Sequence, residues 1–223
     1  MIHDYKDKVV LITGAGKGKG RALAEAFAQF GASIAVNDIS PINLQELVDE
    51  GRGKIKAYTD DIAKKVAIQS IINQVEDDFG RIDILINHAA VEPRSPLLDM
   101  DEWDWHRALD VNLTGTFLAT QSVGRVMREQ GSGVIVNLIS AGISQPEGIQ
   151  NKTAYMASMY GLLALTRAAA AELAPFGIHV HAAGSGLAEF QQAETTIPTG
   201  FIETVLYLCE SSSTGQIINV EER

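Results

Sequence analysis

The most constraining feature of this sequence is an alternation of short apolar runs with longer amphipathic segments. The apolar runs are nearly unbroken, which is typical of strands that are covered on both faces of a parallel sheet. The segments between them are long enough to form crossover helices. The pattern predicts an α/β, three-layer Rossmann fold with a doubly wound parallel sheet of about seven strands. The strands are expected at residues 9–12, 33–36, 54–58, 82–86, 134–139, 178–181 and 216–220.

Helices are expected between these strands, at residues 21–30, 64–79, 101–130 and 153–174. Gly31 and Gly80 follow the first two helices as natural C-terminal caps, and the third helix is long enough to contain a bend. The chain has 223 residues, of which 46% are hydrophobic. This length suits one core, so a single domain is predicted over residues 1–223.

The charge of the chain excludes some classes of partner. The formal net charge is −10, whereas binding to nucleic acid or to an anionic membrane surface requires a cationic face. The sequence contains no apolar stretch long enough to span a bilayer. It also contains no cluster with metal-ligand spacing. We therefore expect a cytoplasmic protein that binds a small-molecule substrate, without nucleic acid, membrane or metal.

A glycine-rich segment directly after the first strand predicts a site for the phosphates of a dinucleotide. The helix that follows would offer unpaired N–H groups and a favourable dipole to an anion. Glycines allow positive φ angles and a close approach of backbone to phosphate. The candidate phosphate-binding residues are Gly14, Gly16, Lys17, Gly18, Lys19 and Gly20.

An aspartate at the end of the second strand bears on the choice of cofactor. Asp38 follows the glycine segment at close to the expected distance of about 20 residues. A carboxylate there accepts hydrogen bonds from the adenosine ribose hydroxyls and repels a 2′-phosphate, which favours NAD. Lys17 favours NADP instead, because a cation could pair with that phosphate. NAD is the predicted cofactor, and NADP is the alternative.

Taken in order, the motifs resemble those of the short-chain dehydrogenase/reductase family. The resemblance runs through roughly the first four fifths of the chain. The matching motifs are the glycine segment after Thr13, Asp61-Ile62, Asn87-His88-Ala89-Ala90, Val111-Asn112, the strand that ends at Ser140, and Tyr155.

The resemblance implies a role for each of these motifs. It implies that Ser140, Tyr155 and Asn112 are the catalytic residues of a reversible hydride transfer between nicotinamide and a carbonyl or alcohol carbon. In the family, the tyrosine is the acid or base and the serine hydrogen-bonds the substrate oxygen. The resemblance further implies that Asp61, Ile62, Asn87 and Ala89 contact the cofactor.

One residue departs from the family at the centre of this chemistry. The family has a lysine four residues after the tyrosine, where this chain has Met159. A thioether has no charge and no donor, so it can neither favour a phenolate nor hold the ribose. Lys152 is one alternative cation, although it lies on the wrong side of Tyr155. His88 is a possible proton shuttle, or a residue that only packs beside the cofactor.

The C-terminal part also departs from the family pattern. No threonine stands at the expected place after the sixth strand, and residues 185–199 form a shortened substrate loop. Three functions remain open. They are an NAD(H)-dependent oxidoreductase acting on a small carbonyl or alcohol, a catalytically impaired dinucleotide-binding protein with a regulatory or structural role, and a non-redox enzyme on the same scaffold. The resemblance also implies a homodimer or homotetramer.

Overall fold

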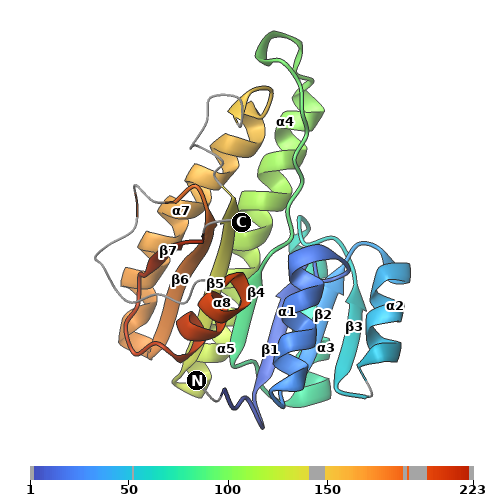
Figure 1. Cartoon of the computed structure of the whole chain (residues 1–223), viewed down its shortest axis with the longest axis vertical. Coiled ribbons are helices and arrows are strands. Elements are labelled where there is room, and N and C mark those ends of the chain that lie inside the picture. The colour runs from blue at the N-terminus through green and yellow to red at the C-terminus, as the bar shows by residue number, and fades with distance from the viewer. Residues whose placement is uncertain (1–2, 52, 141–148, 188–189, 191–199, 221–223) are drawn as a thin grey trace.

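The computed structural model describes residues 3–51, 53–140, 149–187, 190 and 200–220. Within these ranges seven strands form one parallel sheet in the order β3-β2-β1-β4-β5-β6-β7 (Figure 1). The strand order reverses between β1 and β4, as in a doubly wound Rossmann fold. The predicted fold class is therefore confirmed. The strands are β1 (Val9–Thr13), β2 (Ser33–Asp38), β3 (Ile55–Thr59), β4 (Ile84–Asn87), β5 (Gly133–Ser140), β6 (Ile178–Ser185) and β7 (Ile217–Asn219).

Helices cover both faces of this sheet. One apolar cluster packs α1 (Gly18–Gln29), α2 (Pro41–Glu50) and α8 (Phe201–Glu210) on one face. A second cluster packs α3 (Lys65–Phe79) and α5 (Thr116–Gln130), with the C-terminal half of α7 (Thr153–Leu173), on the other. Alternate residues of each strand enter the two clusters, because successive side chains point to opposite faces. Most strand positions are therefore apolar, although Asn37, Lys56 and Asn137 are exceptions. The remaining elements are η1 (Leu97–Asp99), α4 (Glu102–Leu109), η2 (Asp110–Gly115) and η3 (Ala174–Phe176).

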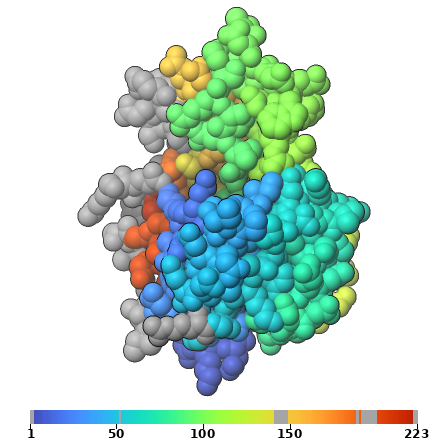
Figure 2. All heavy atoms as spheres, turned by 90° about the vertical axis from the view of Figure 1, so that its right-hand side faces the viewer, coloured from blue at the N-terminus to red at the C-terminus, as the bar shows by residue number. Residues whose placement is uncertain are grey.

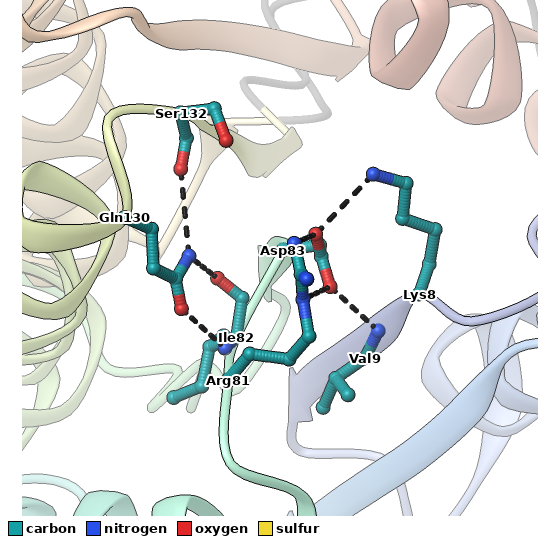
Figure 3. Close-up of polar contacts among 7 residues, drawn as sticks. All are labelled: Lys8, Val9, Arg81, Ile82, Asp83, Gln130 and Ser132. Atoms are coloured by element: carbon teal, nitrogen blue, oxygen red, sulfur yellow. Dashed lines mark hydrogen bonds and ion pairs between the residues drawn. The ribbon is translucent and has the colours of Figure 1, made fainter.

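The fourth strand is shorter than predicted at its amino end. A strand was expected over residues 82–86, but β4 begins at Ile84. The backbone of Ile82 is bound instead by a side chain: Ile82 N–H donates to Gln130 Oε1 at 3.0 Å, and Gln130 Nε2 donates to Ile82 O at 2.8 Å (Figure 3). The primary amide takes the place of a neighbouring strand, which satisfies this backbone outside the ladder.

A buried aspartate fastens the same end of the sheet. Asp83 is 6% exposed and accepts hydrogen bonds from Val9 N–H at 3.0 Å and Arg81 Nε at 2.8 Å (Figure 3). Lys8 Nζ lies 3.3 Å away. Burial alone would raise the pKa of Asp83, but the bonds from Arg81 and Val9 outweigh it and hold the pKa below its usual value. This network ties β1 to β4 at the end opposite to the glycine segment.

Two helices depart from the sequence predictions. The first helix begins at Gly18 rather than at Arg21, because Lys17 is extended and serves as the N-cap residue inside the glycine segment. Helix α2 was not predicted, although Pro41 stands at its first turn and Leu44 and Leu47 form its buried face. The sequence predictions place no helix between the second and third strands, where α2 lies.

The long helix predicted over residues 101–130 is a continuous run of three elements. Between α4 and α5 the backbone forms the π-helical segment η2, which interrupts the α-helical pattern. Helix α4 packs beside α7 beyond the carboxyl ends of the strands. In Figure 2 the green segment that includes α4 rises above the blue and cyan N-terminal half.

The described residues contain neither a membrane-spanning helix nor a cluster of metal-binding side chains. In that part of the chain, no helix is both long and apolar enough to cross a membrane. The same residues contain no group of three or more histidine, cysteine or acidic side chains that could hold a metal ion.

Candidate functional site

The glycine segment forms a tight turn between β1 and the start of α1. Gly14 has a φ of +66°, and a Cβ there would lie 2.6 Å from the Cα of Ala89. Ala15 N–H donates to Asn37 O at 2.9 Å, which ties the turn to β2. Gly18 has a φ of +58°, and the space beside it is open. The turn thus leaves the first N–H groups of α1 uncovered beside an open space, where an anion can approach them.

His88 and Thr13 lie beneath this turn. The Thr13 hydroxyl oxygen accepts hydrogen bonds from the N–H groups of His88, at 3.1 Å, and Ala89, at 3.3 Å. His88 Nδ1 lies 2.9 Å from Gly14 O. A Cβ on Gly20 would lie only 2.6 Å from the same ring nitrogen. Burial lowers the pKa of His88, so the imidazole is a neutral supporting group. This placement favours packing beside the cofactor over proton transfer.

Asp38 sits directly beside the turn. Its carboxylate accepts hydrogen bonds from Gly16 N–H at 3.0 Å and from Ser40 N–H at 2.9 Å. A Cβ on Gly16 would lie 2.8 Å from Asp38 Oδ2. Two backbone donors therefore fix the carboxylate at the carboxyl end of β2, and each of its oxygens retains a lone pair for a further donor.

Gly14, Lys17, Asp38 and His88 line one cavity of about 380 Å³. Asp61 and Ile62 bring the loop after β3 to it, and Arg107 reaches it from α4. Arg107 Nη1 lies 3.0 Å from Asp61 Oδ2. Ile62 is 4% exposed and packs against Gly115 of the π-helical segment. The structure therefore brings Arg107 together with seven residues of the predicted motifs. These seven are Gly14, Lys17, Asp38, Asp61, Ile62, His88 and Ala89.

The side chain of Asn87 points away from this cavity. It is 3% exposed, and its Nδ2 donates to Asn137 Oδ1 at 2.8 Å. Asn137 Nδ2 in turn donates to Thr166 Oγ1 on α7 at 2.9 Å. This chain of amides links β4, β5 and α7 inside the fold. Any contact of Asn87 with a cofactor would therefore come from its backbone.

Ser140 ends β5 at the same edge of the sheet and is exposed. Its register partner is Ser185 at the end of β6, and the two hydroxyl oxygens lie 3.1 Å apart. In such a pair one hydroxyl donates and the other keeps its proton for a third partner. The predicted substrate-binding hydroxyl is thus one of two.

Tyr155 lies in the first turn of α7 and is 7% exposed. It belongs to an apolar cluster with Met159 and Leu187, and Ile139 brings the strand that ends at Ser140 into the same cluster. Met159 is 2% exposed. The position that would carry the family's lysine is therefore part of an apolar packing surface beside Tyr155.

Asn112 lies in the π-helical segment, where its side chain is fully engaged. Its Oδ1 accepts from Val91 N–H at 2.8 Å. Its Nδ2 donates to Val91 O and to Ser158 Oγ, both at 2.9 Å. The Ser158 hydroxyl donates to Tyr155 O at 2.6 Å. Asn112 thus connects the loop after β4 to the helical turn that carries Tyr155.

Neither lysine near these two motifs stands in for the family's lysine. Lys152 is the N-cap residue of α7, and its Nζ pairs with Glu92 at 3.1 Å. This ion pair holds Lys152, the alternative cation, toward the loop after β4. Lys19 Nζ lies 4.9 Å from the centre of the Phe201 ring on α8, which connects the glycine segment to the helix beside it on the same face of the sheet.

Sequence reasoning missed Arg107 and Ser185. Arg107 follows the tryptophan-rich start of a predicted helix, and nothing local in the sequence indicates that it reaches Asp61. Ser185 could have been found, because the predicted sixth strand aligns it with Ser140 once the strand order is known. The predicted features at residues 141–148, 188–189 and 191–199, which include most of the shortened substrate loop, lie outside the described residues.

Comparison with known proteins agrees with this geometry. The profile described as short chain dehydrogenase matches residues 8–199. The 3-oxoacyl-(acyl-carrier-protein) reductase FabG of Thermotoga maritima is 35% identical, with 96% of each chain covered. The D-threitol dehydrogenase of Mycolicibacterium smegmatis is 37% identical over 78% of this chain and 67% of its own length.

Solved structures give the same result. A short chain dehydrogenase from Mycobacterium smegmatis superposes with a TM-score of 0.85 at 30% identity, over 98% of this chain and 93% of the other. An NAD⁺-bound xylitol dehydrogenase superposes with a TM-score of 0.83 at 29% identity, over 97% and 98%. The chain belongs to the short-chain dehydrogenase/reductase family of oxidoreductases, whose members bind a nicotinamide dinucleotide.

Proposed function

We propose that this protein is an NAD(H)-dependent oxidoreductase that interconverts a small carbonyl compound and its alcohol. The observation that carries the proposal is the placement of Asp38. Its carboxylate is held by Gly16 N–H and Ser40 N–H at the wall of the cavity beside the glycine segment. A fixed carboxylate suits two ribose hydroxyls and repels a 2′-phosphate, which favours NAD over NADP.

The proposed cofactor site extends from the glycine segment to the loop after β3. Gly14, Gly18 and Gly20 leave room for the pyrophosphate, and a Cβ on Gly14 or Gly20 would meet backbone or His88. The full set of proposed cofactor-binding residues is Gly14, Gly16, Lys17, Gly18, Lys19, Gly20, Asp38, Asp61, Ile62, Asn87 and Ala89. When bound, the dinucleotide would supply or accept the hydride.

The chain's own residues would orient the substrate and move the proton. Ser140, with Ser185 beside it, would donate a hydrogen bond to the substrate oxygen. Tyr155 would hold the proton that this oxygen gains or loses. Asn112 would keep the turn that carries Tyr155 in place, through Val91 and Ser158. The buried apolar wall around Met159 would exclude water from this region.

A second candidate function is a dinucleotide-binding protein with little catalytic activity. The observation that favours it is Met159, which is 2% exposed in an apolar cluster with Tyr155. A methionine at this position supplies no cation that would stabilise a phenolate at neutral pH. A homodimer or homotetramer is proposed for either function, with a groove between α5 and α7 of about 390 Å³ as the contact surface.

One pair of measurements separates the two functions. NADH and NADPH are titrated by fluorescence, and a panel of small carbonyl and alcohol substrates is then assayed from neutral to alkaline pH. The oxidoreductase predicts tighter binding of NADH and a rate of alcohol oxidation that rises with pH, because the reaction in that direction needs a base. Binding without turnover at any pH would instead support the second function, and a preference for NADPH would overturn the role of Asp38.

A further inference from the structure

The cavity of the proposed cofactor site contains an arginine that belongs to none of the motifs described above. Arg107 lies in the last turn of α4 and lines the cavity together with three acidic residues, Asp38, Asp60 and Asp61. Its side chain is 27% exposed, and that of Asp61 is 18% exposed. Both groups are therefore partly removed from water, where an ion pair is screened less than on an open surface.

The position of Asp61 depends on this arginine. Asp61 Oδ1 accepts from Ala63 N–H at 3.1 Å, and Asp61 Oδ2 accepts from Arg107 Nη1 at 3.0 Å. The first bond comes from the same loop and holds one carboxylate oxygen. The second comes from a different element, α4, and holds the other oxygen. Each oxygen still has a lone pair toward the cavity.

We propose that Arg107 is a positioning residue for the adenine end of the dinucleotide, because it holds the Asp61 carboxylate where an adenine amino group can donate to it. This inference rests on the proposed function. It makes α4 part of the cofactor site, although no motif marks that helix. Arg107 also offsets one of the three carboxylates that would otherwise face an anionic ligand.

Fragments of the dinucleotide separate positioning from simple charge balance. Adenosine is neutral and reports the adenine end alone, ADP-ribose adds the phosphates, and nicotinamide mononucleotide reports the other end. Each is measured by displacement of fluorescent NADH. Arg107→Met is expected to weaken adenosine and ADP-ribose about tenfold, the size expected for one charge-assisted hydrogen bond, and to leave nicotinamide mononucleotide unchanged. Arg107→Lys should recover part of the loss.

Two controls make the result specific. Arg94→Met also removes an arginine from an ion pair, with Glu92, but Arg94 does not line the cavity; it should leave all three affinities unchanged. In an Asp61→Ala background, Arg107→Met should cause no further loss, because Arg107 acts through Asp61. Thermal unfolding of each variant checks that the fold is retained.

Three results would overturn the proposal while the proposed function stands. They are unchanged adenosine binding in Arg107→Met, an equal loss for nicotinamide mononucleotide, and a further loss in the Asp61→Ala background. Loss of ADP-ribose binding alone would show that the arginine acts by charge and not by positioning, which also contradicts it. If the wild-type protein binds neither NADH nor any fragment, the proposed function fails and this inference fails with it.

Discussion

His181 should make the stability of this protein fall steeply in mild acid. The residue lies in the middle of β6, is 0% exposed, and neither ring nitrogen has a hydrogen-bond partner among the described residues. Burial, with a smaller contribution from the nearby His179 ring, lowers the pKa of His181 to about 4. Its ordinary value is 6.5. The folded protein therefore keeps this ring neutral over a pH range in which the unfolded chain binds a proton.

The magnitude follows from the two pKa values. Between pH 6.5 and about 4 the unfolded state holds the extra proton, so stability decreases as the pH falls through this window. A difference of one pKa unit corresponds to about 1.4 kcal/mol. Lowering the pH from 7 to 5 should thus remove about 2 kcal/mol of the free energy of unfolding through His181 alone.

Other histidines also contribute to the pH dependence of stability, so a variant is needed to isolate the contribution of His181. Burial lowers the pKa of His88 and acts in the same direction. The hydrogen bonds that the His3 ring donates to Glu210 and Glu203 outweigh burial and raise the pKa of His3. The contribution of His3 to stability is present below pH 6.5 and is lost as the pH rises. Their effects cancel when the wild type and His181→Leu are compared at the same two pH values.

The assay is urea unfolding followed by far-ultraviolet circular dichroism at pH 7 and pH 5. His181→Leu should lose about 2 kcal/mol less than the wild type between these conditions. It should match or exceed the wild-type stability at pH 7, since it removes unpaired polar atoms from the core. His106→Leu, which removes an exposed histidine, is the control and should behave as the wild type. An identical pH dependence in His181→Leu and the wild type would refute the reasoning.

Three further predictions follow from the site and the fold. Gly14→Val should abolish NADH binding and destabilise the fold, because its Cβ would meet Ala89 backbone at 2.6 Å in a left-handed conformation; calorimetric titration and thermal unfolding test this, and normal NADH affinity would contradict it. Asp83→Asn should cost about 2–3 kcal/mol at pH 7, because Arg81 loses its anionic partner. The cost should shrink as the pH falls through the lowered pKa of Asp83, and urea unfolding at neutral and acid pH measures it. Met159→Lys should raise alcohol oxidation at pH 7 by about tenfold or more, because Tyr155 acts as the base in that direction and each unit by which the added cation lowers its pKa gives about ten times more phenolate. Met159→Leu is the control, and steady-state kinetics that do not distinguish the two variants would exclude the missing lysine as the cause of low activity.

The fold could be predicted because most strands are apolar over most of their length. A parallel sheet covered on both faces requires that pattern, and few folds alternate it with helices in this way. Strand ends were less predictable. Ile82 is as apolar as a strand residue, yet Gln130, which is far away in sequence, binds its backbone and ends the ladder.

The site was predictable where function is carried by backbone geometry. Gly14 and Gly18 have the positive φ angles that their motif implies, and Asp38 lies beside them. It was not predictable where two side chains meet across the fold. The ion pair between Arg107 and Asp61 depends on where α4 lies relative to the loop after β3, which no local pattern in the sequence specifies.

The π-helical segment Asp110–Gly115 sets the rotational phase between α4 and α5. A π turn accommodates one residue more than an α turn, so removal of a single residue there would allow one uninterrupted α-helix. Such a deletion would rotate α4 relative to α5 by about 100°, the angle between successive residues of an α-helix. Arg107 would then face away from Asp61, and Asn112 would lose Val91. For protein engineers this segment is therefore a place where chain length, more than residue identity, decides whether the two ends of the cofactor and substrate site face each other.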